Sequence, residues 1–457
     1  MKSVHFVGVS GIGVSGAAKL AVESGLIVSG SADMENEQTS VLEHSGMIFY
    51  LGHKAEQLNK PDMVVKSAAV PENNPEILEA RRKNIPVFLY SEYLGMLMSK
   101  KRGIAVSGTH GKTTTTAMAA AILANAGLDP TVVCGGVMQN FSSNAVYGRG
   151  DYFLSEACEY NRSFLDLKKW FGIVTNIEPD HLDYYRDIDD IKSAFSKFLK
   201  NTDPRGFSVV NGDDRNIQDV LSTVKSSGVV TVGFTNDSRY RVINTSSDHG
   251  VYSFQIEDKG AKVLDIRLSV PGEYNCINAA LSAVMALNIG VQKSVVETGV
   301  ASYKGTARRM EHIGVVGGNH IYSDYAHHPT EISIAIKALK EMHPEKNICL
   351  IFQPHQYSRT QELFKDFALV LGEPEQVILT EIFRQRDSNR SVNAVRGTDL
   401  YREVKKSGKN NITYIHDPER INVAICGSVK KNSIIVFMGA GDIDDTARDY
   451  VRQYGGN

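Results

Sequence analysis

The stretch Ile104-Ala-Val-Ser-Gly108-Thr-His-Gly111-Lys112-Thr113-Thr114 decides the fold. A short apolar run comes first, a turn with two glycines follows, and Gly-Lys-Thr opens a helical segment. That order predicts a phosphate loop, in which backbone N–H groups at a helix N-terminus face an anion. Lys112 would reach the terminal phosphates, and the Thr113 hydroxyl would ligate Mg²⁺. The alternative is a glycine turn that binds nothing, and the register of strand, turn, lysine and helix disfavours it.

The alternation of strand and helix continues outward from this stretch. Short apolar runs bounded by Gly, Asn and Asp are separated by helix-like segments, at residues 4–9, 104–107, 173–176, 349–352 and 434–438. Short buried strands between amphipathic helices predict an α/β protein with doubly wound, parallel sheets.

Two polar joints divide the 457 residues, the first at Lys100-Lys-Arg-Gly103 and the second at Lys304-Gly-Thr-Ala-Arg-Arg309. A length of roughly 150 residues per domain also gives a prior of about three domains. Alternating apolar and polar residues at 229–268 predict a small antiparallel insertion in the middle one. We therefore expect three α/β domains, at residues 1–100, 101–305 and 306–457.

The composition narrows the class of protein. With 50 Lys plus Arg against 52 Asp plus Glu, the chain offers no basic stripe for nucleic acid or an anionic membrane. Its five cysteines lack a C-x-x-C pair, which argues against a zinc ribbon or a disulfide framework. The opening residues form a strand rather than a signal peptide, and no apolar run approaches the length of a membrane span. We expect a cytoplasmic protein.

Carboxylates and a histidine follow two further strands, with Glu156 and Glu159 after one and Asp180 and His181 after the other. Hard oxygen ligands plus one imidazole near a triphosphate suit a Mg²⁺ site. Each cluster taken alone is better explained as a solvated loop or a helix cap. Their position at strand ends beside a phosphate loop favours the metal site.

The glycine-rich turn at residues 8–16 follows the first strand and suggests a dinucleotide site. Ser10 occupies the middle glycine of the G-x-G-x-x-G pattern, which disfavours hydride chemistry on NAD.

Taken together, the motifs resemble the Mur ligase family over essentially the whole chain. The shortened phosphate loop of that family reads Gly-Thr-x-Gly-Lys-Thr-Thr, which accounts for Val106 in place of a first glycine. His110 in the variable place is typical of the alanine-adding members. The matching segments are residues 5–15, 29–33, 52–53, 66–71, 108–116, 154–160, 175–181, 271–279, 305–310, 323–331, 352–360 and 437–443.

The resemblance implies that the chain binds ATP with Mg²⁺, Mn²⁺ being the alternative metal. Thr113, Glu156 and His181 would ligate the metal, and Asn275 and Asn278 would hold the adenine. The other implied ATP contacts are Gly108, Thr109, His110, Gly111, Lys112, Thr114, Arg309 and Asp324.

The resemblance also implies two substrate-binding groups. The first domain would be Rossmann-like and hold the UDP part of a sugar nucleotide through Gly11, Ile12, Gly13, Ser31, Asp33 and Ser67. The third domain, also Rossmann-like, would face the amino acid and the muramoyl carboxylate through Tyr325, His327, His355 and Arg359. Lys112, His327 and Arg359 would be catalytic, with His327 accepting the amine proton or orienting the amino acid.

Several positions depart from the family pattern: Ser10 replaces a glycine, Tyr274 a histidine, Ser323 an aspartate and Gln356 an arginine. Phe195 stands where several sister ligases have a carbamylated lysine, so no carbamate is expected.

The implied function is ATP-dependent addition of L-alanine to UDP-N-acetylmuramate through an acyl phosphate, in peptidoglycan synthesis, by a monomer or weak homodimer. Ligands would draw the three domains together, because an exposed acyl phosphate hydrolyses. Two alternatives remain open. A recycling ligase that attaches a whole tripeptide shares most of these motifs, and a phosphate-loop switch would hydrolyse ATP without a UDP-sugar.

Overall fold

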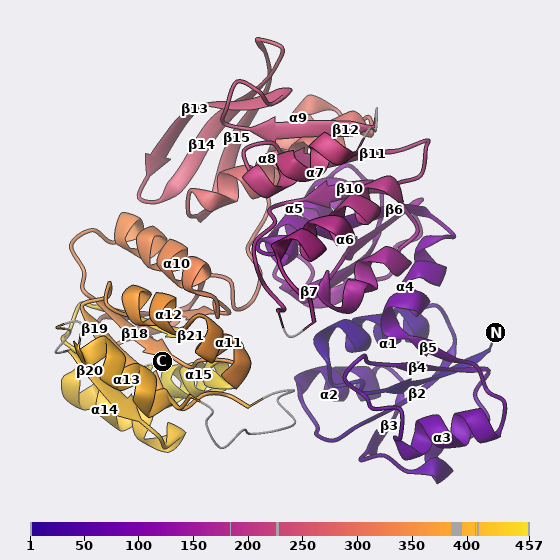
Figure 1. Ribbon diagram of the computed structural model, residues 1–457, viewed down its shortest axis with the longest axis horizontal. Helices are drawn as coiled ribbons and strands as arrows, with labels where there is room; N and C mark the ends of the chain where they lie inside the picture. The colour runs from indigo at the N-terminus through magenta and orange to yellow at the C-terminus, as the bar shows by residue number, and fades with distance from the viewer. Residues whose placement is uncertain are drawn as a thin grey trace. The chain divides into compact units, whose positions relative to one another are not determined.

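A computed structural model of the protein describes residues 2–182, 184–224, 228–384, 395–406, 408 and 411–455. The described residues form three sheets flanked by helices, so the predicted α/β class is confirmed (Figure 1). No helix in these ranges is long and apolar enough to cross a membrane. The chain forms two compact units, the first comprising Met1–Thr245, Ser253–Ser269 and Cys276–Lys304, the second Ser246–Tyr252, Val270–Asn275 and Gly305–Asn457.

The first sheet is parallel and five-stranded among the described residues. Its strands are β1 (Ser3–Val7), β2 (Ile27–Ala32), β3 (Ile48–Leu51), β4 (Met63–Lys66) and β5 (Val87–Leu89). Its helices are α1 (Ile12–Glu23), α2 (Glu37–His44), η1 (Ala55–Gln57), α3 (Pro75–Arg82) and α4 (Tyr90–Met98). The spatial order β3-β2-β1-β4-β5 reverses at β1, and ligands bind at the carboxyl ends of strands beside such a reversal.

The second sheet contains the phosphate-loop strand. Its strands are β6 (Arg102–Ser107), β7 (Thr131–Met138), β8 (Ser143–Val146), β9 (Tyr152–Glu156), β10 (Lys169–Val174), β11 (Phe207–Asn211), β12 (Val229–Gly233), β13 (Tyr240–Asp248), β14 (Val251–Asp258) and β15 (Ala261–Pro271). Its helices are α5 (Lys112–Asn125), η2 (Tyr160–Asp166), α6 (Ile188–Lys200), α7 (Arg215–Thr223), α8 (Tyr274–Asn288) and α9 (Lys293–Ala301). In the order β15-β14-β13-β12-β11-β10-β6-β9-β7-β8, β6 lies between β10 and β9 and is parallel to both.

The antiparallel insertion begins later than expected. We predicted it at residues 229–268, but β12 pairs in parallel with β11 and therefore extends the parallel sheet. The turns His249-Gly250 and Lys259-Gly260 join β13 to β14 and β14 to β15, and the four residues have positive φ angles. Two-residue turns of that conformation close antiparallel hairpins, so β13, β14 and β15 form the antiparallel part, and β13 joins it to the parallel sheet by pairing in parallel with β12.

The third sheet is buried on both faces. Its strands are β16 (Glu311–Val316), β17 (Asn319–Asp324), β18 (Ile348–Phe352), β19 (Gln376–Thr380), β20 (Ile412–Ile415) and β21 (Ile434–Met438), in the order β16-β17-β21-β18-β19-β20. Its helices are α10 (Pro329–Met342), α11 (Tyr357–Glu362), α12 (Phe364–Val370), α13 (Gly397–Lys406), η3 (Pro418–Arg420), α14 (Ile421–Ser428) and α15 (Ile443–Tyr454).

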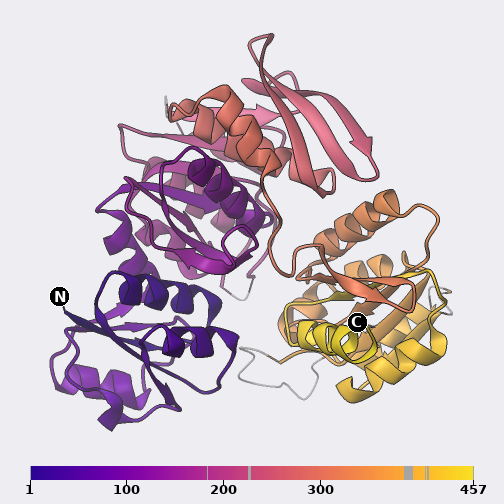
Figure 2. The same ribbon diagram turned by 180° about the vertical axis from the view of Figure 1, so that it is seen from behind.

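Alternate residues of β21 enter two different cores of this unit. Val436 packs in the cluster that contains residues of α10 and α12, and Phe437 packs in the cluster that contains residues of α15. A continuous apolar strand is the sequence pattern of a parallel sheet covered on both faces. Figure 2 shows the C-terminal helix α15 in front of this sheet, on the face opposite to that seen in Figure 1.

Candidate nucleotide and ligation site

The phosphate loop joins the end of β6 to the start of α5, as predicted. Gly108 has a φ of 138° and Gly111, the N-cap of α5, has a φ of 80°, in the region that favours glycine. A Cβ at Gly108 would lie 2.0 Å from Thr175 Oγ1. These two positions therefore require glycine, and they leave the first turn of α5 open toward an anion.

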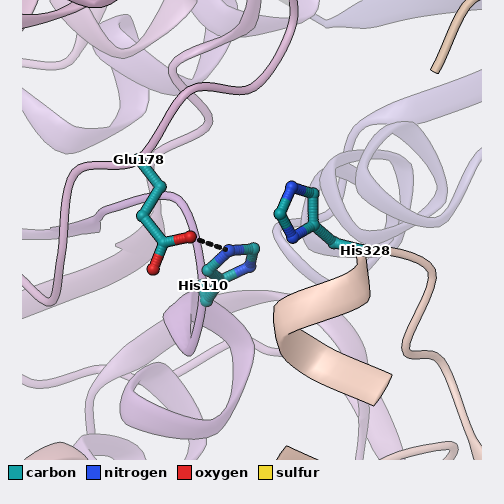
Figure 3. Close-up of side chains that lie close together, drawn as sticks. All are labelled: His110, Glu178 and His328. Carbon is teal, nitrogen blue, oxygen red and sulfur yellow. Dashed lines mark ion pairs between the residues drawn. The ribbon is translucent and has the colours of Figure 1, made fainter. Parts of the chain in front are cut away.

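The segment after β10 holds this loop in place. The Asn176 side chain accepts a hydrogen bond from His110 N at 2.8 Å and donates one to His110 O at 3.1 Å. Thr175 Oγ1 also donates to His110 O at 2.6 Å. The imidazole of His110 forms an ion pair with Glu178 at 3.4 Å, and the two side chains point toward each other (Figure 3).

Lys112 forms an ion pair with the buried carboxylate of Glu159. Its Nζ is 3.0 Å from Glu159 Oε2, and the two side chains are 14% and 3% exposed. It also donates to the carbonyl oxygens of Gly108 and Thr109. Burial lowers the pKa of Lys112, but the attraction of Glu159 together with that of other nearby groups, including Glu156, raises that pKa above its usual range. Lys112 is therefore a permanent cation beneath the loop.

The predicted metal ligands divide into two neighbouring groups. Thr113 Oγ1 donates to Glu156 Oε2 at 3.0 Å, so the hydroxyl and the carboxylate are in contact. His181 lies instead beside Asp180 and Glu159, with Nε2 3.7 Å from Asp180 Oδ2 and 3.9 Å from Glu159 Oε1. Glu159, which the sequence places in the carboxylate cluster but not among the three implied metal ligands, therefore lies beside both the phosphate-binding and the metal-binding candidates.

The second group suits a divalent cation. One ligand atom from each of Glu159, Asp180 and His181 lies within 4.8 Å of the others. Both oxygens of the buried Glu159 carboxylate lie against Lys112 Nζ, Oε2 at 3.0 Å and Oε1 at 3.1 Å. Two of the three ligands are carboxylates, whose oxygens Mg²⁺ prefers, so the group fits that metal.

Asn278 contacts the phosphate loop directly. Its Oδ1 accepts a hydrogen bond from Thr115 Oγ1 at 3.2 Å, and a Cβ at Gly111 would lie 2.7 Å from the same oxygen. Asn275, one turn earlier in α8, donates to Pro271 O at 2.6 Å. The structure thus gives Asn278 a role in supporting the loop, and the adenine contacts of both asparagines stay predictions.

The glycine-rich turn lies at the edge of an apolar cavity. Gly11 is the N-cap of α1, and a Cβ at Gly13 would lie 2.9 Å from the Tyr90 hydroxyl. The cavity has a volume of about 150 Å³, and Ile12, Gly13, Tyr90 and Glu156 are among the residues that line it. The glycine-rich turn and the candidate metal carboxylate therefore line the same cavity.

The three other predicted contacts of the sugar nucleotide are located at strand ends. Ser31 lies near the end of β2 and Ser67 directly follows β4, and Ser67 N donates to Val7 O at 3.0 Å. The Ser31 hydroxyl is buried and donates to Glu76 Oε2 at 2.6 Å, so it faces the interior. Asp33 directly follows β2, and its side chain is 86% exposed.

In the second unit, Asp324 ends β17 and organises the surrounding loop. Its carboxylate accepts hydrogen bonds from Met310 N at 2.6 Å and Ala326 N at 2.7 Å. Burial raises the pKa of Asp324 above its usual value, and the nearby Arg309 opposes that rise. The Arg309 guanidinium lies 4.9 Å from the centre of the Tyr325 ring.

The remaining four predicted residues form one connected group in this unit. The ring centres of His327 and Tyr325 are 5.3 Å apart, and those of His327 and His355 are 6.0 Å apart. Arg359 Nη1 lies 3.4 Å from His355 Nδ1, and both side chains are buried. The Phe383 ring stacks on His355 with a centre-to-centre distance of 5.9 Å and is a neighbour that the sequence did not indicate.

Family models and known proteins match this chain over nearly its whole length. Models described as Mur ligase family, catalytic domain, Mur ligase middle domain, and Mur ligase, glutamate ligase domain match residues 3–126, 106–286 and 308–441. The UDP-N-acetylmuramate–L-alanine ligase of Aquifex aeolicus is 38% identical over 453 residues, which cover 99% of this chain and 98% of that protein. The chain belongs to the Mur ligase family. The corresponding ligase of Clostridium novyi is 39% identical over 97% of this chain and 95% of its own length.

Solved structures of Mur ligases have a similar fold to this chain. The crystal structure of UDP-N-acetylmuramate-alanine ligase from Thermotoga maritima has a TM-score of 0.86 and 30% identity, covering 99% of each chain. A murein peptide ligase from Psychrobacter arcticus has a TM-score of 0.75 at 22% identity, covering 100% of this chain and 99% of its own, and shows the shared fold alone.

Proposed function

We propose that the protein is an ATP-dependent ligase that joins L-alanine to UDP-N-acetylmuramate during peptidoglycan synthesis. The observation that carries the proposal is the phosphate loop, in which Lys112 forms an ion pair with Glu159 and the Thr113 hydroxyl donates a hydrogen bond to Glu156. The names of the relatives at 38% and 39% identity give the substrate class. The three domains at residues 1–100, 101–305 and 306–457 would each contribute to binding.

The first step activates a carboxylate. ATP would bind with its phosphates at the N-terminus of α5, where the first N–H groups of the helix have no acceptor within the helix and no N-cap side chain. An oxygen of the muramoyl carboxylate attacks the γ-phosphorus, the bond to the β,γ-bridging oxygen breaks, and ADP leaves behind an acyl phosphate. Lys112 stabilises the charge that spreads over the transferred phosphoryl group, because its own charge is fixed by Glu159.

Mg²⁺ would be held by oxygens of Thr113, Glu156 and Glu159 and by the imidazole of His181, and it would neutralise phosphate charge. We include Glu159 because one of its carboxylate oxygens lies within 4.8 Å of ligand atoms of both Asp180 and His181.

The second step forms the amide. The amine of L-alanine attacks the acyl carbon, the amine loses a proton, and inorganic phosphate departs with the carboxylate oxygen that carried it. His327 Nδ1 lies 3.0 Å from Tyr325 O, an acceptor, so the ring proton belongs on Nδ1 and Nε2 carries the lone pair. His327 would accept the amine proton there, and Arg359 would pair with a carboxylate.

The direct test measures phosphate release from ATP and Mg²⁺ with UDP-N-acetylmuramate, in separate reactions with L-alanine, glycine, L-serine and the tripeptide. The proposal expects release that needs both the UDP-sugar and L-alanine, and a product heavier by one alanyl residue. Release that needs the tripeptide would assign the recycling reaction instead. Release that is indifferent to the UDP-sugar would favour a nucleotide switch and refute the ligase.

A further inference from the structure

A buried glutamate connects two histidines beneath the nucleotide face of the first sheet. Glu76, in the first turn of α3, has no exposed surface. Its Oε1 is 2.9 Å from Nε2 of the equally buried His5, and its Oε2 is 2.7 Å from Nδ1 of His53. The Ser31 hydroxyl donates to the same Oε2 at 2.6 Å, and the Ser29 hydroxyl lies 2.8 Å from His5 Nδ1.

The ionisation of Glu76 fixes the protons of both rings. Hydrogen bonds from His5, Ser31 and His53 outweigh burial and hold the pKa of Glu76 below its usual value. A carboxylate only accepts hydrogen bonds, so both ring nitrogens that face it carry protons. His5 is therefore protonated on Nε2, and in the neutral ring its Nδ1 accepts from Ser29. His53 is protonated on Nδ1, and in the neutral ring Nε2 carries the lone pair.

The outward nitrogen of His53 faces the ligand side of the domain. Its Nε2 lies 3.5 Å from Asp33 Oδ1, and the His53 side chain is 14% exposed. Asp33 directly follows β2, and Ser31 O accepts hydrogen bonds from Gly8 N and Val9 N of the glycine-rich turn. In Rossmann-like domains, an acidic residue at this strand end accepts hydrogen bonds from the nucleoside of the ligand.

We propose that Glu76 is a positioning residue that presents His53 Nε2 beside the Asp33 carboxylate as a pair of hydrogen-bond acceptors for the uridine of the substrate. This inference rests on the proposed function, because it names the part of the sugar nucleotide that His53 and Asp33 would bind. Two donor groups of uridine have the required chemistry, namely the ribose hydroxyls and the N3–H of the base. The pair therefore selects for a nucleoside that offers hydrogen-bond donors at this point.

The first experiment determines the tautomers of His5 and His53 in the full-length protein. Long-range ¹H–¹⁵N NMR spectra of the histidine rings distinguish protonation on Nδ1 from protonation on Nε2. We expect the neutral His53 ring to be protonated on Nδ1 and His5 on Nε2, and we expect the His53 signal to change in Glu76→Gln. A His53 ring protonated on Nε2 alone would overturn the inference.

The second experiment measures binding of UDP, 2′-deoxy-UDP and N3-methyl-UDP by calorimetry without ATP or alanine. Losing a hydrogen bond to a neutral group weakens binding by roughly 2- to 10-fold. We expect a loss of that size for UDP in Glu76→Gln and in His53→Ala, and a smaller penalty for one of the two analogues than in the parent protein. The analogue whose penalty shrinks identifies the donor, ribose or base.

His44→Ala is the matched control, because His44 is an exposed histidine of α2 that bonds only to Ser40 O among the described residues. Unchanged UDP affinity in a folded Glu76→Gln or in His53→Ala would overturn the inference. If Glu76→Gln does not fold, His53→Ala decides alone. A parent protein that binds UDP normally but ligates nothing would instead overturn the proposed function, so the two failures are distinguishable.

Discussion

Replacing Lys112 by methionine should destabilise the first unit as well as abolish phosphate release. Lys112 Nζ is 3.0 Å from Glu159 Oε2, and the Glu159 side chain is only 3% exposed. Removing one partner of a buried ion pair leaves the other as an uncompensated charge, which costs about 3–5 kcal/mol. Trp170, the single tryptophan, lies in β10 of the same unit and reports its unfolding by fluorescence in urea.

A second substitution separates this cost from the loss of activity. The double variant Lys112→Met/Glu159→Gln has no unpaired Glu159 charge in its interior. At least about 2 kcal/mol of the lost stability should therefore return. Activity should stay absent, because the cation at the phosphates is still missing.

Lys192→Met is the control for the substitution itself. Lys192 Nζ lies 2.7 Å from Asp219 Oδ2, but these side chains are 20% and 55% exposed. Exposed pairs contribute about 0–1 kcal/mol, so this variant should unfold almost as the parent does. The reasoning is refuted if Lys112→Met costs no more than Lys192→Met, or if Glu159→Gln fails to restore stability.

Two further predictions concern backbone conformation and pH. Gly111→Ala and Gly25→Ala both place alanine at positive φ, 80° and 85°, and should each cost about 1–2 kcal/mol of stability. Only Gly111→Ala also places a Cβ 2.7 Å from Asn278 Oδ1. It alone should therefore lower kcat/KM in the phosphate-release assay, by about 100-fold. Equal activities of the two glycine variants would contradict this prediction. Burial lowers the pKa of Lys169 to about 7, so between pH 7 and the unfolded value of 10.5 the unfolded chain binds more protons and stability rises with pH. Lys169→Met should remove that rise, measured as the free energy of unfolding across this range, and an unchanged slope would count against the burial of a neutral lysine.

The phosphate loop was predictable because its signals are local. A buried strand, two glycines and Gly-Lys-Thr lie within eleven residues, and the structure places β6, the turn and α5 in that order. The apolar run at residues 434–438 likewise coincides with β21, because a strand buried on both faces shows no polar interruption.

Contacts between distant segments were not predictable in the same way. Glu156 and Glu159 are three residues apart, and only the backbone path after β9 decides that Glu159 pairs with Lys112 while Glu156 contacts Thr113. Glu76 lies 71 residues from His5, and a glutamate in a helix beginning with Asn-Pro-Glu is typical of an exposed first turn. Nothing in its neighbours along the chain indicates burial between two histidines.

The error at β12 has a similar cause. Val229–Gly233 reads Val-Val-Thr-Val-Gly and stands directly before the alternating hairpin strands, and a β-strand pattern alone does not distinguish parallel from antiparallel pairing. The direction of β12 is set by its place beside β11 after the crossover through α7.

The most direct test of the central claim follows one oxygen atom. UDP-N-acetylmuramate labelled with ¹⁸O in its carboxylate is converted with ATP, Mg²⁺ and L-alanine, and the released phosphate is analysed by mass spectrometry. Attack of the carboxylate on the γ-phosphorus predicts that one ¹⁸O atom is transferred to each phosphate. Phosphate that carries no ¹⁸O would mean that water attacked ATP, and it would contradict the proposed acyl phosphate.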